Sequence, residues 1–167
     1  MTPMTELLFA QAQRLAAPAP FALLTTAAPD GRDNIMAVSW WTFLSNHPPM
    51  LGVCLSKKGL SGSLLSETGE FALNLVGEEQ KAAGLRCGQC SGRTVDKLRE
   101  LSIPLEPART IRPMLVSGSR AAFECRLVKS MEVSDHIFYA AEILACGGDP
   151  QIRQLFAWDG YARLDTL

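Results

Sequence analysis

The chain of 167 residues lacks the features that mark several common protein classes. No stretch reaches the roughly 18 uninterrupted apolar residues that a bilayer-spanning helix requires. Its 16 lysines and arginines are balanced by 17 aspartates and glutamates, so the basic excess of nucleic-acid-binding proteins is missing. No Gly-rich turn after the first predicted strand matches a dinucleotide fingerprint. We therefore expect no membrane insertion, no nucleic-acid partner and no doubly wound nucleotide-binding sheet.

Histidine is scarce, with two residues, and the five cysteines are an odd number without framework spacing. The N-terminal segment has no basic region and only a short apolar run, so it does not resemble an export signal. We therefore expect a cytoplasmic protein whose cysteines are free thiols. Cys87 and Cys90 have CxxC spacing, but no second such pair completes a zinc site and no thioredoxin-like β-α unit surrounds them. We expect no metal and prefer a structural motif; a dithiol or metal-based redox site stays an alternative.

The composition that is present, 47% apolar and 20% charged, is that of one globular domain spanning residues 1–167. A weak amphipathic pattern over 4–15 predicts a helix, which prolines 18 and 20 end. We therefore expect an N-terminal helical arm over 1–17 and a C-terminal tail over about 147–167.

Runs of β-forming residues alternate with turn signals along most of the chain. They predict strands over 21–26, 34–44, 50–55, 70–76, 121–127 and 136–146. Helices are predicted over 60–67, 78–85 and 95–101, the last with Thr94 as N-cap, and 87–93 is predicted to be a Gly-rich loop. This order predicts a mainly β fold, a closed antiparallel barrel with short helical insertions.

Five segments in order carry a family resemblance. They are Ala22-Leu-Leu-Thr-Thr with Asn34-Ile-Met-Ala-Val-Ser-Trp-Trp-Thr42, Ser45-Asn-His-Pro-Pro-Met50 with Leu55-Ser-Lys-Lys58, Ser66 to Asn74, Cys87 to Lys97, and Asp135-His-Ile-Phe-Tyr-Ala-Ala-Glu142. Together they resemble the flavin reductase-like family of FMN-binding split barrels, in particular its flavoredoxin-like branch. The resemblance implies an antiparallel Greek-key split β-barrel and a homodimer that binds FMN near the subunit interface. Family members usually carry glycine before the glutamate of the last segment, where this chain has Ala140 and Ala141.

A flavin site needs hydrogen-bond donors at the edge of the ring where reduction builds negative charge. The resemblance places Asn34 and the segment Val38, Ser39, Trp40, Trp41 and Thr42 there, with backbone amides and hydroxyls along the ring. Paired tryptophans on a buried strand are equally typical of core packing, and that interpretation stays open.

The phosphate of such a ligand needs an anion site. Ser56, Lys57 and Ser61 follow a strand and precede a helix start, which together favour negative charge. Arg93 and the neighbouring Lys97 can bind phosphate or pair with acids of their own helix. Asn74 ends a strand where the family places an amide near the flavin, and a purely structural asparagine is the alternative.

His136 is the titratable residue that the resemblance places beside the open flavin face, where nicotinamide would stack. A histidine bonded to a turn is the structural alternative. The leading hypothesis is an enzyme, an FMN-binding oxidoreductase or flavin reductase that passes hydride from NAD(P)H through the flavin to an acceptor. The alternative is a flavoredoxin-type electron carrier that a partner protein reduces without direct reaction with NAD(P)H.

Overall fold

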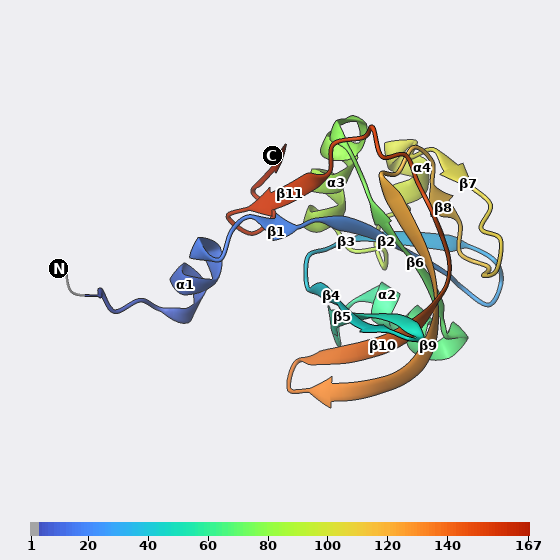
Figure 1. Ribbon diagram of the computed structural model, residues 1–167, viewed down its shortest axis with the longest axis horizontal. Coiled ribbons are helices and arrows are strands. Elements are labelled where there is room, and N and C mark those ends of the chain that lie inside the picture. Colours follow the sequence, from blue (N-terminus) through green and yellow to red (C-terminus); the bar gives the residue numbers. More distant parts are fainter. Residues whose placement is uncertain (1–3) are drawn as a thin grey trace.

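The computed structural model describes residues 4–167 and is built around one seven-stranded antiparallel sheet (Figure 1). Its strands are β2 (Ala22–Ala27), β3 (Asp33–Val38), β4 (Trp41–Asn46), β5 (Pro49–Ser56), β6 (Glu70–Leu75), β9 (Ala121–Val133) and β10 (His136–Gly147). They pair in the order β3-β2-β6-β9-β10-β5-β4, so strands distant in sequence become neighbours. This arrangement confirms the predicted mainly β class with short helical insertions.

Helices and smaller sheets surround this sheet. The helices are α1 (Phe9–Leu15), α2 (Leu60–Thr68), α3 (Lys81–Gln89) and α4 (Lys97–Leu101), with a 3-10 turn η1 at Glu78–Gln80. A three-stranded sheet joins β1 (Ala19–Pro20), β11 (Leu155–Trp158) and β12 (Arg163–Thr166), and β7 (Leu105–Glu106) pairs with β8 (Leu115–Val116). The predicted C-terminal tail therefore contributes two strands that tie the end of the chain to β1.

Several sequence-based predictions need correction. The barrel is not closed, because in residues 4–167 no ladder joins the edge strands β3 and β4. The strand predicted over 34–44 is two strands, because the chain bends at Ser39 and Trp40 and changes from the β2 side of the sheet to the β5 side. The last helix is capped by Asp96 rather than Thr94, since the Asp96 carboxylate accepts a hydrogen bond from the Arg99 amide at 3.1 Å.

The N-terminal arm is shorter in helix than predicted. Helix α1 covers Phe9–Leu15 rather than 4–15, and it has no buried residue. Figure 1 shows it projecting from the body of the molecule. The first three residues of the predicted arm lie outside the described residues. No helix in the described range 4–167 is long and apolar enough to cross a membrane.

Strand β2 separates two apolar cores. It is buried along its whole length, and successive side chains alternate between its faces. Leu24 packs with Val53 and Phe71 in the first core, inside the curved sheet. Leu23 packs in the second core, which α3, α4, β11 and β12 help to cover. The strand therefore holds the helical side of the molecule against the barrel side.

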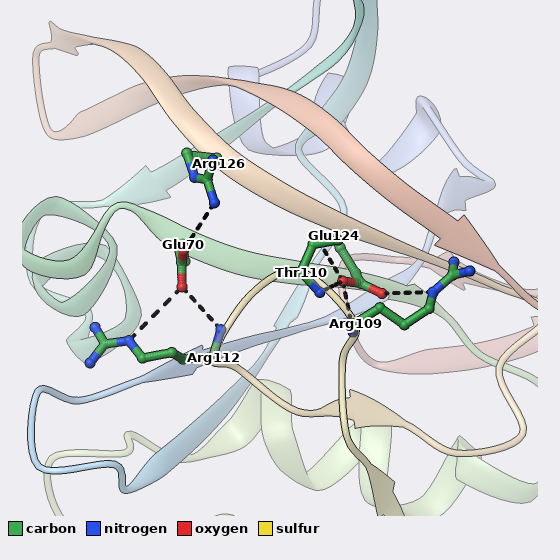
Figure 2. Close-up of polar contacts among 6 residues, drawn as sticks. All are labelled: Glu70, Arg109, Thr110, Arg112, Glu124 and Arg126. Carbon is green, nitrogen blue, oxygen red and sulfur yellow. Dashed lines mark hydrogen bonds and ion pairs between the residues drawn. The ribbon is translucent and has the colours of Figure 1, made fainter.

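A pair of carboxylates anchors the long loop before β8 to the main sheet (Figure 2). Glu124 on β9 accepts hydrogen bonds from the amides of Arg109 and Thr110 and from the Thr110 hydroxyl, at 3.0, 2.7 and 2.6 Å. Glu70 on β6 accepts from the Arg112 amide at 3.0 Å. Burial raises the pKa of Glu124, but the hydrogen bonds from Thr110 and Arg109 together hold it below its usual range. The carboxylate is therefore ionised and fixed.

Candidate functional site

The larger cavity, of about 970 Å³, opens where the chain bends between β3 and β4. Its wall includes the end of β5, the start of α2, the C-terminal end of α3 and the first residue of β10. Residues of helix α1 and of the turn between β11 and β12 line the remaining side. A cavity of this size is in the range that binds small molecules and cofactors. It is the first candidate site of the molecule.

The bend between β3 and β4 supplies an unsatisfied polar group to this cavity. Ser39 and Trp40 leave the strand ladder, although the Cys54 amide still donates to the Trp40 carbonyl at 2.8 Å. The buried hydroxyl of Ser39 has no hydrogen-bond partner in the part of the chain that the structure describes. Burial raises the pKa of Tyr161, and contacts with the side chain and backbone of Ser39 lower it in part, so the Tyr161 hydroxyl lies close to Ser39. A hydroxyl without a partner on a cavity wall is the kind of group that a bound ligand can satisfy.

Trp40 and His136 form an aromatic pair at the same cavity. Their ring centroids lie 4.8 Å apart with the planes tilted by 31°. The Nδ1 atom of His136 lies 2.8 Å from a carboxylate oxygen of Asp135, and this hydrogen bond lowers the pKa of Asp135. With Nδ1 engaged, Nε2 is the ring nitrogen left for another partner. The structure therefore fixes His136 on two sides, by the hydrogen bond to Asp135 and by the tilted Trp40 ring.

The start of α2, beside the bend, has features that favour a negative charge. Helix α2 has nine residues, and Ser61 lies in its first turn with its side chain buried. The Asn34 amide donates to the Ser61 hydroxyl at 2.8 Å. A Cβ atom on Gly92 would lie 2.1 Å from the Asn34 amide oxygen, so only glycine fits there without a shift. The cavity wall at this helix start also includes Ser56, Lys58 and Ser61. A cation and a helix N-terminus both favour negative charge.

The structure brings some predicted site residues together and leaves others elsewhere. Those lining the larger cavity are Val38, Ser39, Trp40, Ser56, Ser61 and His136. The Trp41 indole instead donates to the Pro20 carbonyl at 3.1 Å and packs against the first core. Thr42 is exposed on β4, and Lys57 pairs with Glu132 at 2.8 Å. Roles for these three in ligand binding stay predictions that the cavity geometry does not support.

Asn74 and Arg93 have defined structural partners. The fully buried Asn74 amide donates to the Leu23 carbonyl and accepts from the Val116 amide, both at 3.0 Å. This uses both ends of the amide to join β2, β6 and β8. Arg93 donates to the Ser63 hydroxyl at 2.9 Å and reaches the Lys58 carbonyl at 3.3 Å, which holds its loop on the start of α2. Arg93 lines a second cavity rather than the larger one.

Among the residues that line the cavity, Tyr161 was missed by the sequence analysis, and Lys97 was considered there only as a phosphate ligand or as a helix-pair residue. Tyr161 reaches the cavity from the turn between β11 and β12, a contact that no local pattern indicates. Lys97 lines it although it lies on a short charged segment that is typical of a solvated helix. One local signal for the burial of Lys97 is its spacing from Leu101, which lies four residues later and packs on the second core. Residues four apart lie on the same face of a helix.

The CxxC pair also lies at this cavity, with Cys87 on helix rather than in the predicted loop and Cys90 directly after the helix end. Cys87 is inside α3 because the helix continues to Gln89, with Gly84 and Cys87 buried on its inner side. Burial raises the pKa of Cys87 to about 11, which keeps it a thiol at neutral pH. All five cysteines are free, and in the described residues no three His, Cys, Asp or Glu side chains gather as a metal site would require. The pair is therefore a poor candidate for a reactive dithiol.

A flavin mononucleotide fits these observations. The cavity is large enough, its wall has an unpartnered hydroxyl and an aromatic pair, and one end has a helix N-terminus with hydroxyls and Lys58. An open antiparallel barrel with such a cavity defines the class as a split-barrel ligand-binding protein.

Comparison with known proteins identifies the family. Residues 14–165 match the family described as "Flavin reductase like domain", so the chain belongs to this family of flavoprotein oxidoreductases. The chain is 33% identical over 128 residues to the NADH-dependent flavin reductase StyB of Pseudomonas fluorescens, covering 75% of this chain and 69% of that protein. It is 31% identical over 113 residues to a protein of Archaeoglobus fulgidus, covering 68% of this chain and 64% of that relative. The crystal structure of flavoredoxin from Methanosarcina acetivorans has the same fold, with a TM-score of 0.83, 22% identity, and coverage of 100% of this chain and 91% of that one.

Proposed function

We propose that this protein binds FMN in the larger cavity and acts as an NAD(P)H-dependent flavin reductase-type oxidoreductase. The observation that carries the proposal is the unpartnered Ser39 hydroxyl on the wall of a cavity of about 970 Å³. The membership in the flavin reductase family and the similarity to StyB support the same reaction class.

Each part of the cavity has a role in this proposal. Ser39 donates a hydrogen bond to the ring edge where reduction builds negative charge, and Trp40 covers apolar ring surface. Ser56, Lys58 and Ser61 hold the phosphate at the start of α2, while Asn34 orients the Ser61 hydroxyl. The bound flavin supplies the hydride and electron chemistry, and the chain supplies binding and orientation.

His136 is proposed to face the electron donor. Its Nδ1 atom is held by Asp135 and its ring by Trp40, which leaves Nε2 to bind the donor or to stabilise negative charge. The role of His136 is therefore in positioning and electrostatics, and hydride transfer itself needs no acid from the chain.

A homodimer is part of the proposal. Large apolar side chains are exposed on β4 and on the β9–β10 hairpin, among them Phe43 at 56%, Leu44 at 42% and Met131 at 56%. Large apolar side chains exposed in this number are typical of proteins that make a protein–protein contact. Trp40, another exposed apolar residue at 47%, lines the cavity, which is consistent with a ligand site near the proposed subunit contact.

The flavoredoxin-type alternative would keep the flavin but not the reaction with NAD(P)H. Its basis in the sequence was the pair Ala140 and Ala141, which would narrow the donor site. Neither alanine lines the cavity, and Ala141 is buried in the first core. The structure therefore gives no reason to prefer this alternative.

The test begins with an absorbance spectrum of the purified protein after FMN is added and unbound FMN removed. The proposal expects a yellow protein whose flavin absorbance is lost when NADH or NADPH is added without oxygen. Retention of colour with both nucleotides, but bleaching by a reductase protein, would establish the electron carrier. A protein that cannot retain or bind FMN would refute the proposed cofactor.

A further inference from the structure

Helix α1 forms part of the wall of the larger cavity without being packed into the molecule. Ala10, Gln13 and Arg14 of this helix line the cavity, and so do Ala16 and Ala17 directly after it. Among the described residues, no side chain of α1 is buried or belongs to either apolar core. The helix therefore borders the cavity, but hydrophobic burial does not hold it there.

The other elements of the cavity wall are fixed by the two cores. Val38 and Leu55 line the cavity and belong to the first core, and Cys87 lines it and belongs to the second. Displacing these elements would expose packed apolar surface to water. The large apolar side chains of α1, such as Phe9 and Leu15, are exposed already. Helix α1 is therefore the part of this wall that can move at the least cost in free energy.

One exposed ion pair joins α1 to the rest of the molecule. The Arg14 Nε atom lies 3.4 Å from a carboxylate oxygen of Asp159, in the turn between β11 and β12. Within residues 4–167 this is the only polar contact from α1 to another helix, strand or turn. The turn itself is fixed, because the ring of Tyr161 packs edge-on against Phe21 with 6.0 Å between the ring centroids. We call the Arg14–Asp159 pair the latch.

The segment between α1 and β1 provides a hinge. Residues 16–18 belong to no helix or strand, and β1 begins at Ala19, which pairs with Ala157 of β11. Figure 1 shows α1 outside the sheets and connected to them through β1. A movement of α1 about residues 16–18 therefore leaves the sheets in place.

We propose that α1 is a lid over the larger cavity, closed by the latch, which controls how fast the ligand enters and leaves. The proposal rests on the proposed function in taking FMN as that ligand. Both partners of the latch are exposed, so it is weak and opens by thermal motion. Entry and release both wait for the same opening, so the lid slows both by the same factor. It changes the exchange rates of the ligand and leaves its affinity unchanged.

The first test measures FMN association and dissociation with the full chain by stopped-flow fluorescence. Arg14→Ala and Asp159→Asn are each expected to raise both rates by about 2–5-fold, the range for loss of an exposed ion pair. The Kd is expected to stay within about twofold of the wild-type value. The double variant is expected to be no faster than either single variant, because both remove the same contact. A faster release alone, with a weaker Kd, would show that Arg14 binds the ligand and would overturn the proposal.

A matched control removes another exposed arginine–aspartate pair. Arg32 pairs with Asp30 at 2.8 Å in the turn between β2 and β3, and neither residue lines the larger cavity. Arg32→Ala is therefore expected to leave both FMN rates at their wild-type values. An equal acceleration in Arg32→Ala would mean that the rates respond to the overall charge, and would refute the latch.

Cysteine labelling tests the lid in the absence of any ligand. Cys54 and Cys90 line the larger cavity, whereas the exposed Cys146 does not. In the FMN-free protein, Arg14→Ala is expected to speed alkylation of Cys54 and Cys90 by about 2–5-fold, measured by mass spectrometry. Cys146 is expected to react at the wild-type rate and serves as the internal control. Unchanged labelling of both cavity cysteines would refute the lid, whatever the effect on FMN.

The labelling separates failure of this inference from failure of the proposed function. If FMN does not bind but labelling in the cavity responds to Arg14→Ala, the lid stands and the proposed cofactor is refuted. If FMN binds and the latch variants change neither its rates nor the labelling, only the lid is refuted.

Discussion

Replacement of Glu124 by alanine tests whether the loop before β8 is held by one buried carboxylate. The substitution leaves the amides of Arg109 and Thr110 and the Thr110 hydroxyl without their acceptor. It also removes the ion pair with the Arg109 guanidinium, at 3.6 Å. Each orphaned donor costs about 1–3 kcal/mol, and water entering the space offsets part of this. We expect Glu124→Ala to lower the free energy of unfolding by about 3–5 kcal/mol.

The assay is thermal and urea unfolding of the FMN-free protein at pH 7. A loss of this size corresponds to a fall in Tm of about 6–20 °C for a chain of this length. Glu70→Ala is the matched control. The Glu70 side chain is more exposed, at 17% against 1%, and it accepts one hydrogen bond, from the Arg112 amide, where Glu124 accepts three. We expect it to cost about 1 kcal/mol. A Glu124→Ala variant within 0.5 kcal/mol of the wild type, or less affected than Glu70→Ala, would refute the reasoning.

The same carboxylate gives a pH dependence of known sign. The pKa of Glu124 is lower in the folded protein than in the unfolded chain, so its contribution to stability is complete above the unfolded value. That contribution is lost as the pH falls through the folded value. The stability difference between wild type and Glu124→Gln is therefore expected to shrink below about pH 4.5, the ordinary pKa of glutamate. A difference that grows with acidification would contradict this assignment.

Three further predictions concern the cavity and the exposed apolar face. Ser39→Ala is expected to weaken FMN binding by about 2–10-fold in a fluorescence titration. It is not expected to lower the stability of the FMN-free protein, since the hydroxyl has no partner there. Thr42→Ala, outside the cavity, is its control in the same titration. Alkylation of Cys87 is expected to be slow at pH 7 and to accelerate as the pH approaches 11, so rapid labelling at pH 7, located by mass spectrometry, would contradict its burial. Phe43→Asp is expected to shift a dimer toward monomer in light scattering, and an unchanged mass would place the subunit contact elsewhere.

Local patterns predicted most strands because their residues alternate or are uniformly apolar. The segment 121–127 reads clearly as a strand since Glu124 and Arg126 interrupt apolar neighbours. The bend at Ser39 and Trp40 is invisible to such patterns, because both halves of 34–44 are rich in β-forming residues. Yet this bend forms the cavity, so the position of the site follows from tertiary structure.

The candidate site was predicted only in part, because local motifs identify residues but not the distant elements that surround them. Ser39, Trp40, Ser61 and His136 were found through ordered motifs, and the fold brings them to one cavity. Lys97 was weighed only as a phosphate ligand or helix-pair residue, because burial of a lysine depends on what distant elements place over it.

The double burial of β2 has a consequence for how the molecule melts. Its odd and even side chains belong to different cores, so loss of this strand removes a wall from each. Neither half can then lose its packing while the other stays intact. Calorimetry should accordingly record a single heat-absorption peak with equal calorimetric and van't Hoff enthalpies, despite the two separate groups of packed side chains.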